Sequence, residues 1–140
     1  ANGALYYGDP GTNNINFGAS AGVAMTPKIK IPQGKSQLEF WIYWDTESGT
    51  TYDKSAVFLY LDGVKHNIGS TGSPNSGALY YSGTGSYGSA KKWYHIKTDT
   101  SAWAGKELQL QFYFNSGDSA VNTGQGIFVD DIKLTVDCGA

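Results

Sequence analysis

The sequence predicts an all-β domain folded as a single antiparallel β-sandwich of the jelly-roll kind. Glycine is frequent, with 19 positions among 140, and charged residues make up only 16%, a composition that suits short strands joined by tight turns. About eight segments have the alternating or β-branched and aromatic pattern of strands, with turn signals between them. No helical period of useful length interrupts them. We therefore expect residues 1–140 to form one domain with a real core.

The first third of the chain is predicted to contain three strands, of which the first is short. Residues 4–7 read as a strand that ends in a Gly-Asp-Pro-Gly turn. Residues 12–22 are polar and are expected to be a long ordered loop. Pro27 should place the strand at 23–31 at a sheet edge or a bulge. Residues 36–45 alternate most clearly, with an apolar face made of Leu38, Phe40, Ile42 and Trp44.

The rest of the chain continues the pattern. Asp62-Gly63 is a strong hairpin signal between strands at 56–61 and 64–68. The segment 69–90 is rich in glycine and serine and carries a brief strand candidate at 78–81. A single helical turn is expected around Trp103. The remaining predicted strands are 93–98, 107–115 and 126–136.

The last strand raises a question about charge. We expect the more apolar face of this strand to meet the core. That face carries Phe128, Asp130, Ile132, Leu134 and Val136. This places Asp130 at the edge of a core, where a carboxylate is costly unless it is hydrogen-bonded, paired or bound to a cation.

Composition excludes several classes of function. The net charge is −2 and every basic residue is a lysine, so we expect no nucleic-acid partner. No apolar run is long enough for a membrane span, and no signal peptide is present. The start at Ala1 fits a processed or excised N-terminus. Cys138 is the only cysteine; a partner in a neighbouring module and a free terminal thiol both remain open.

Nothing in the sequence predicts catalysis. Both histidines, His66 and His95, lie in predicted strands, and no G-x-S-x-G motif occurs. Glu39 and Asp45 belong to a pool of carboxylates for glycoside hydrolysis, but a surface-charge reading is favoured. We therefore expect a protein that is not an enzyme.

Calcium is the metal that the residues fit best. The segment 9–18 offers hard oxygen ligands on a flexible backbone, and it would reach Asp130 if the first and last strands lie side by side. In the alternative, Asp9 caps its own turn and Asp130 binds backbone amides. The run with Asp45, Glu47 and Asp53 is a second candidate for the same role.

Aromatic residues are candidate sugar platforms. Trp41 and Tyr43 lie on the polar face of their strand, and three further rings lie in the Gly/Ser-rich segment: Tyr80, Tyr81 and Tyr87. Alternatively, outer-face rings are covered by loops and form minor cores. We favour the covered arrangement for Trp41 and Tyr43. We favour sugar binding for the three tyrosines of the Gly/Ser-rich segment.

Several segments resemble a known kind of module. The tail reads SAWAGKELQLQFYF and then GQGIFVDDIKL, the middle reads FWIYWDTESGTTYDKSAVFLYLDG, and the opening reads ALYYGDP followed by TPKI. Together they resemble the jelly-roll modules attached to secreted bacterial metallopeptidases of the immune inhibitor A type, which are similar to MAM domains of animal ectodomains. The long segment 69–90 departs from that pattern, so its role is not implied by the resemblance.

The fold is also similar to galactose-binding-like jelly rolls, including carbohydrate-binding modules of family 6. In those modules an Asp before the apolar run of the last strand helps to hold a structural calcium ion. Asp130 occupies that position here, Asp9 falls near the acidic ligand of the first strand, and Asn14 is a third choice. The resemblance thus implies a calcium ion that clamps the two ends of the chain.

The expected function is that of a non-catalytic, calcium-stabilised accessory module cut from a larger secreted protein. Its expected partners are a polysaccharide or an extracellular protein, together with other domains of the parent chain. The alternative is a structural or substrate-recruiting module of a secreted metallopeptidase that has no glycan ligand.

Overall fold

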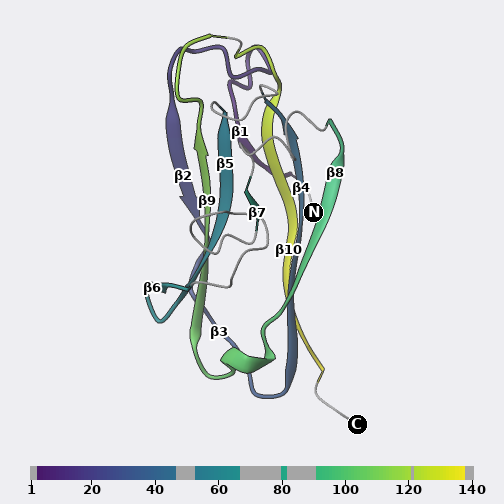
Figure 1. Ribbon diagram of the computed structural model, residues 1–140. Helices are drawn as coiled ribbons and strands as arrows, with labels where there is room; N and C mark the ends of the chain where they lie inside the picture. The colour runs from purple at the N-terminus through teal and green to yellow at the C-terminus, as the bar shows by residue number, and fades with distance from the viewer. Residues whose placement is uncertain (1–2, 47–52, 67–79, 82–90, 121, 138–140) are drawn as a thin grey trace.

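Two antiparallel sheets pack face to face in this protein (Figure 1). The computed structural model describes residues 3–46, 53–66, 80–81, 91–120 and 122–137. The predicted all-β sandwich is confirmed. The elements are β1 (Leu5–Tyr7), β2 (Ala21–Met25), β3 (Ile29–Lys30), β4 (Lys35–Asp45), β5 (Lys54–Leu61), β6 (Val64–Lys65), β7 (Tyr80–Tyr81), β8 (Trp93–Asp99), the 3-10 helix η1 (Ser101–Trp103), β9 (Glu107–Asn115) and β10 (Gly126–Asp137).

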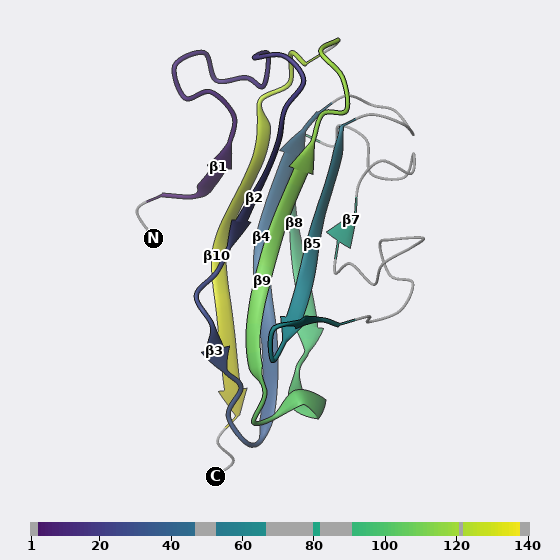
Figure 2. The ribbon, with the colours of Figure 1, turned by 90° about the vertical axis from the view of Figure 1, so that its left-hand side faces the viewer.

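The first sheet has the order β1-β10-β4-β8, and the second has the order β2-β9-β5-β6. In the second sheet β3 also pairs with β9, and β7 pairs with β5. The two layers are seen from their edge in Figure 1, and the second sheet faces the viewer in Figure 2. The first and last strands are neighbours, which is the condition that the expected calcium site required. The strand expected at 23–31 is two strands, β2 and β3, interrupted at Pro27 and both paired to β9.

The core lies between the inner faces of the sheets. The predicted apolar face of β4 is confirmed, since its four side chains are at most 2% exposed. Phe40 of β4 meets Phe112 of β9 edge-on, with ring centroids 5.8 Å apart. Each buried side chain of this size contributes about 1.5–3 kcal/mol. The β5 and β9 members of the core are Val57, Leu59, Leu61, Leu108, Leu110, Phe112 and Phe114.

The predicted core face of the last strand is wrong for its first half. Ile127 and Val129 are 7% and 3% exposed and point inward, so Phe128 and Asp130 face outward. The register with β4 then shifts between Asp130 and Lys133, and Asp131 has a φ of 50°. This β-bulge adds one residue and reverses the alternation. Leu134 consequently packs against the core, as predicted.

Two predicted turns are confirmed. Asp62 and Gly63 have φ values of 52° and 79° and join β5 to β6, with Leu61 opposite Val64. Positive φ at both positions is what a two-residue hairpin of this kind needs. The helical turn expected around Trp103 is η1. Within the described ranges, no helix is both long enough and apolar enough to cross a membrane.

Replacing Gly126 with alanine should destabilise the fold by about 2–4 kcal/mol. Gly126 begins β10 with a φ of 96°, and an added Cβ would overlap the carbonyl oxygen of Tyr7 and approach Ile15 Cγ2 to 2.9 Å. Urea unfolding measures the change. Gly63→Ala is the matched control, because Gly63 has a φ of 79° with nothing within 4 Å of an added Cβ; it should cost about 1 kcal/mol. Equal losses in both variants would contradict the close approach of β1 and β10.

Candidate functional site

The outer face of the first sheet carries rows of side chains that cross its strands. The strand register sets Tyr6 of β1 opposite Phe128 of β10, Phe128 opposite Tyr43 of β4, and Tyr43 opposite Trp93 of β8. Side chains opposite one another in a sheet lie on the same face. These four residues, called here the aromatic row, therefore span all four strands of the sheet.

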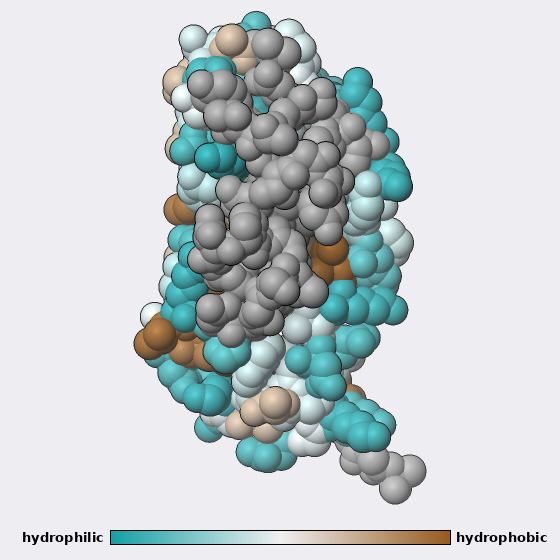
Figure 3. Space-filling view, in the orientation of Figure 1, coloured by the Kyte–Doolittle hydropathy of each residue, from teal (hydrophilic) through white to brown (hydrophobic). Residues whose placement is uncertain are grey.

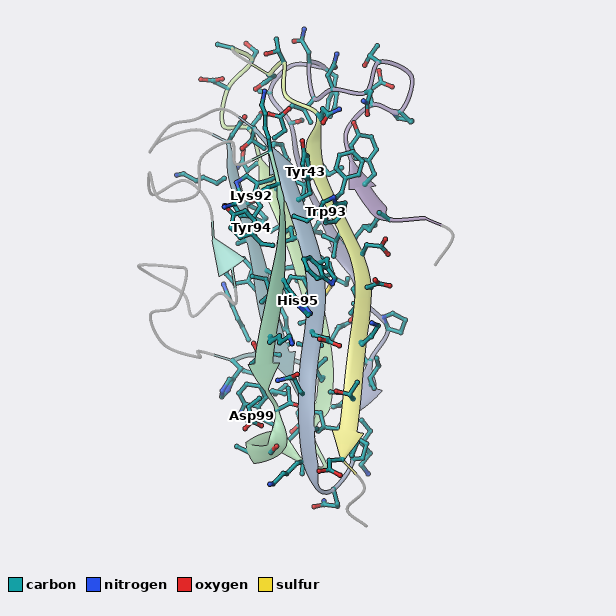
Figure 4. The ribbon with its side chains drawn as sticks, turned by 90° about the vertical axis from the view of Figure 1, so that its right-hand side faces the viewer. Tyr43, Lys92, Trp93, Tyr94, His95 and Asp99 are labelled. Carbon is teal, nitrogen blue, oxygen red and sulfur yellow. The ribbon has the colours of Figure 1, made fainter. Side chains whose placement is uncertain are left out.

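The rings of the aromatic row pack on one another. Tyr6 and Phe128 are stacked with centroids 4.4 Å apart, and Tyr43 meets Phe128 edge-on at 5.8 Å. Tyr43 and Trp93 are tilted at 5.7 Å, and Figure 4 shows both in the upper half of this face. Three of the rings are only half-buried, and Trp93 at the sheet edge is 45% exposed. Trp93 is therefore the ring of this row most accessible to a ligand.

Gln125 holds two of these rings in place. Tyr6 donates its hydroxyl to the Gln125 backbone oxygen at 2.8 Å, and Tyr43 donates to Gln125 Oε1 at 3.0 Å. Burial, followed by the charge of Asp45, raises the pKa of Tyr43. Burial, followed by the charge of Asp9, raises the pKa of Tyr6. Both hydroxyls therefore remain protonated donors at neutral pH.

A second row contains Asp130, Trp41 and His95, which are opposite one another on β10, β4 and β8. Trp41 and His95 are stacked with centroids 4.3 Å apart and an interplanar angle of 11°. His95 Nε2 lies 2.8 Å from Glu39 Oε2, and Figure 4 shows His95 over β4.

His95 of β8 stacks on the Trp41 indole, and β10 lies on the other side of β4. The opposing residue there is Asp130, whose Oδ1 accepts a 2.7 Å hydrogen bond from the Asp131 amide. Trp41 is 37% exposed, and the edge of the sandwich along β8 is mainly hydrophilic (Figure 3). We call the pair of Trp41 and Asp130 the Trp41 notch. In this pair a partly exposed indole is opposite a carboxylate acceptor on the neighbouring strand.

The predicted ligand-binding aromatics fall in two places. Trp41 and Tyr43 lie together on the outer face of the first sheet. The backbone of Tyr80 and Tyr81 forms β7, which pairs with β5 of the second sheet. Their side chains, and Tyr87 entirely, lie outside the described residues.

The predicted metal ligands are not all brought together. Asp9 and Asn14 form an isolated bridge, but Asp130 lies farther along β10. The pairing of Tyr7 with Ile127 leaves Asp130 about five strand residues, roughly 17 Å, from the level of Asp9. One ion cannot contact both carboxylates. Among the described residues, no group of three or more His, Cys, Asp or Glu is arranged to hold a metal.

The Asp9 carboxylate closes its own turn. Asp9 Oδ1 accepts from the Gly11 amide at 2.8 Å, and Oδ2 accepts from Thr12 Oγ1 at 2.9 Å. The Gly11 bond, followed by the Thr12 bond, lowers the pKa of Asp9. With the Asp130 bond to its neighbouring amide, this matches the alternative considered from the sequence. Asp9 and Asn14 oxygens still have the chemistry that calcium prefers, so calcium in this loop stays a prediction.

The second metal candidate is buried at the end of the sandwich. Asp45 is 8% exposed and Asp53 is 1% exposed. Asp45 accepts from the Gln125 amide at 3.2 Å and lies 3.8 Å from Lys91 Nζ. Glu47, the third residue of that candidate, lies outside the described residues.

In the described part of the chain, neither histidine is paired with a serine or cysteine that could act as a nucleophile. His95 contacts Glu39 and Trp41, and His66 meets Trp103 edge-on at 4.9 Å. Neither ring hydrogen-bonds a serine or cysteine among the residues described.

Sequence reasoning missed four residues of the outer face: Tyr6, Trp93, His95 and Phe128. The period-2 alternation places Trp93 and His95 on one face of their strand. That alternation does not tell which residues of other strands lie opposite them. The wrong face assigned to the last strand also hid Phe128.

No protein-family model matches the chain. Over 115 residues it is 30% identical to the pre-pro-metalloprotease PrtV of Vibrio cholerae serotype O1, in strains M66-2 and ATCC 39315 / El Tor Inaba N16961. The match covers 81% of this chain but only 12% of the protease. The resemblance to part of a bacterial metallopeptidase is thereby confirmed. A solved structure, the K3 cleaved adhesin domain of Lys-gingipain from Porphyromonas gingivalis W83, matches with a TM-score of 0.46 and 18% identity, covering 89% of this chain and 71% of that one.

The Asp9 turn should make part of the stability dependent on pH. Its lowered pKa means that the ionised carboxylate stabilises the fold above the unfolded-state pKa near 4, and that this contribution is lost as pH falls through the folded-state pKa. Asp9→Asn should therefore unfold at a lower temperature than the wild type at pH 7, and the gap should narrow below about pH 4. Thermal unfolding across pH 3–7 measures both. A constant gap would contradict the charge-dependent turn.

Proposed function

We propose that this chain is a non-catalytic, extracellular accessory module of a larger bacterial protein and that it binds carbohydrate on the outer face of its first sheet. The observation that carries the proposal is the Trp41 notch, in which an indole 37% exposed lies opposite the carboxylate of Asp130. Trp93, 45% exposed, provides a second ring one row away.

The chemistry of the notch matches that of a sugar ring. A pyranose presents C–H groups on its faces and hydroxyl groups around its rim. Its C–H face can rest on an indole, while a neighbouring carboxylate accepts from the hydroxyl groups. The Asp130 carboxylate can accept such hydrogen bonds because the Asp131 amide uses only one lone pair of Oδ1. The hydroxyl groups of Tyr6 and Tyr43 in the aromatic row donate to Gln125 and keep lone pairs that can accept from a sugar hydroxyl.

Neighbouring side chains hold the rings of the platform in place. Trp41 is held by the stacked His95 ring, which Glu39 holds in turn at 2.8 Å. Tyr43 is held by Gln125 and by two neighbouring rings. Side chains already ordered lose little entropy on binding, and this favours affinity for a weakly interacting ligand such as a sugar.

The accessory role is supported by the protease match. The segment of similarity is 12% of the relative's length, which is the size expected of one module among several. A second candidate function is a structural or substrate-recruiting module that binds no glycan. The packing of the aromatic row on itself favours that candidate, because Tyr6 and Phe128 turn their faces toward each other.

We keep structural calcium as part of the proposal, now with a smaller ligand set. Asp9 and Asn14 share one loop and bring carboxylate, amide and backbone oxygens, whereas Asp130 belongs to the Trp41 notch. A calcium ion held by the loop would stabilise the first turn of the chain.

Trp41→Ala and Trp93→Ala should each weaken binding to the glycans found on an array at least tenfold, because each removes a ring face. Titration calorimetry with the best array glycan measures the loss. Phe17→Ala is the control, since Phe17 is an aromatic residue of similar exposure, 47%, in the loop before β2; it should bind as the wild type does. Binding that survives both tryptophan changes, or that no array glycan supports in the wild type, would favour the structural module.

Calcium should raise the thermal unfolding midpoint with increasing concentration, since a ligand that binds only the folded state stabilises it by mass action. Differential scanning calorimetry in calcium and in excess chelator measures the shift. Asp9→Asn should abolish the calcium-dependent part, whereas Asp130→Asn should keep it. A wild-type midpoint that is the same in calcium and in chelator would remove calcium from the proposal.

A further inference from the structure

A third row on the outer face lies next to the Trp41 notch and is charged. The register sets Lys133 of β10 opposite Glu39 of β4, and Glu39 opposite Lys97 of β8. We call these three residues the charged row. The bulge after Asp130 is what brings Lys133 to this face, because without it the alternation would point that side chain into the core.

The carboxylate in the charged row is already engaged. Glu39 Oε2 lies 2.8 Å from His95 Nε2, and the Glu39 side chain is 17% exposed. Lys97 and Lys133 are both exposed, and neither makes an ion pair within 4 Å among the residues that the structure describes. The row therefore presents two ammonium groups around one carboxylate that has its own partner.

Both lysines are within reach of a ligand on Trp41. One row is separated from the next by two residues along a strand, or about 6.6 Å, and neighbouring strands are about 4.8 Å apart. A lysine side chain is long enough to close this gap toward a group at the rim of a sugar ring. Trp41 thus lies between the aromatic row, which has no formal charge, and the charged row with its two free ammonium groups.

From this arrangement we propose that the ligand is an acidic glycan, one that carries a carboxylate or sulfate on its sugar rings. This inference rests on the proposed carbohydrate function. The sugar ring contacts Trp41 with its hydroxyl groups toward Asp130, and its anionic group points toward Lys97 and Lys133. Asp130 repels an anionic group placed directly over it, so the acidic substituent is directed to the charged row.

The nearby acidic residues limit the direction of the ligand. Asp99 lies on β8 in the row after Lys97, opposite Gln37, and its carboxylate accepts from the Ser101 amide at 2.8 Å. Asp137 ends β10 opposite Lys35. Asp131 is exposed in the bulge between Asp130 and Lys133 and adds another carboxylate near the site. An anionic group is therefore favoured only close to the ammonium groups of Lys97 and Lys133.

The experiment is a binding comparison on matched pairs of glycans. The pairs are oligogalacturonate and its methyl ester, sialylated and desialylated lactosamine, and sulfated and desulfated chondroitin. The protein is tested as the full chain at 50 mM and 500 mM sodium chloride. We expect at least one acidic member to bind at least tenfold more tightly than its neutral partner at low salt, with the difference shrinking at high salt.

Each outcome separates the two proposals. Neutral and acidic members that bind equally would overturn the acidic-glycan inference and leave carbohydrate binding standing. Binding by no glycan of either kind would overturn carbohydrate binding and the inference with it. A preference for the acidic member that is the same at both salt concentrations would also overturn the role of the two lysines.

Variants test the residues themselves. Lys97→Gln and Lys133→Gln together should reduce the acidic-to-neutral affinity ratio at least tenfold. Lys30→Gln, at an exposed lysine of β3 in the other sheet, is the matched control and should leave the ratio intact. Circular dichroism and the unfolding midpoint verify that each variant folds. An unchanged ratio in the folded double variant would overturn the proposal.

Discussion

The antiparallel pairing of β10 with β4 is the interaction on which the rest of the structure depends. These two strands form the centre of the first sheet, with β1 added outside β10 and β8 outside β4. Their inner sides supply Ile127, Val129 and the apolar face of β4 to the core. Their outer sides supply Tyr43, Trp41, Phe128 and Asp130 to the candidate site. One ladder of backbone hydrogen bonds therefore positions the core and the site together.

The β-bulge between Asp130 and Lys133 lets one strand serve both purposes along its whole length. Before the bulge, odd-numbered residues of β10 face inward; after it, even-numbered residues such as Leu134 do. The extra residue is accommodated at Asp131, whose φ of 50° is in the left-handed region that Asp tolerates better than most residues. Because the bulge reverses the alternation, Asp130 and Lys133 lie in consecutive rows on the outer face.

The outer face of the first sheet combines rings held by their neighbours with rings that are exposed. Trp41 stacks on His95, and Tyr6 and Tyr43 donate hydrogen bonds to Gln125, yet Trp41 and Trp93 are more than a third exposed. Exposed tryptophans forgo hydrophobic stabilisation that burial would provide. A sheet is a suitable support for such a surface because its strands fix the spacing of the rows.

The sequence by itself determined the all-β class, the buried face of β4, the hairpin at Asp62-Gly63 and the short turn at Trp103. These features depend on neighbours a few residues apart, through the period of 2 and the chemistry of tight turns. The Asp9 turn was likewise foreseen as an alternative. Only the tertiary structure decided that Asp130 lies opposite Trp41 and not beside Asp9. The physical reason is that register between strands distant in the chain, and the bulge that resets it, follow from the packing of both sheets and leave no local pattern in the sequence.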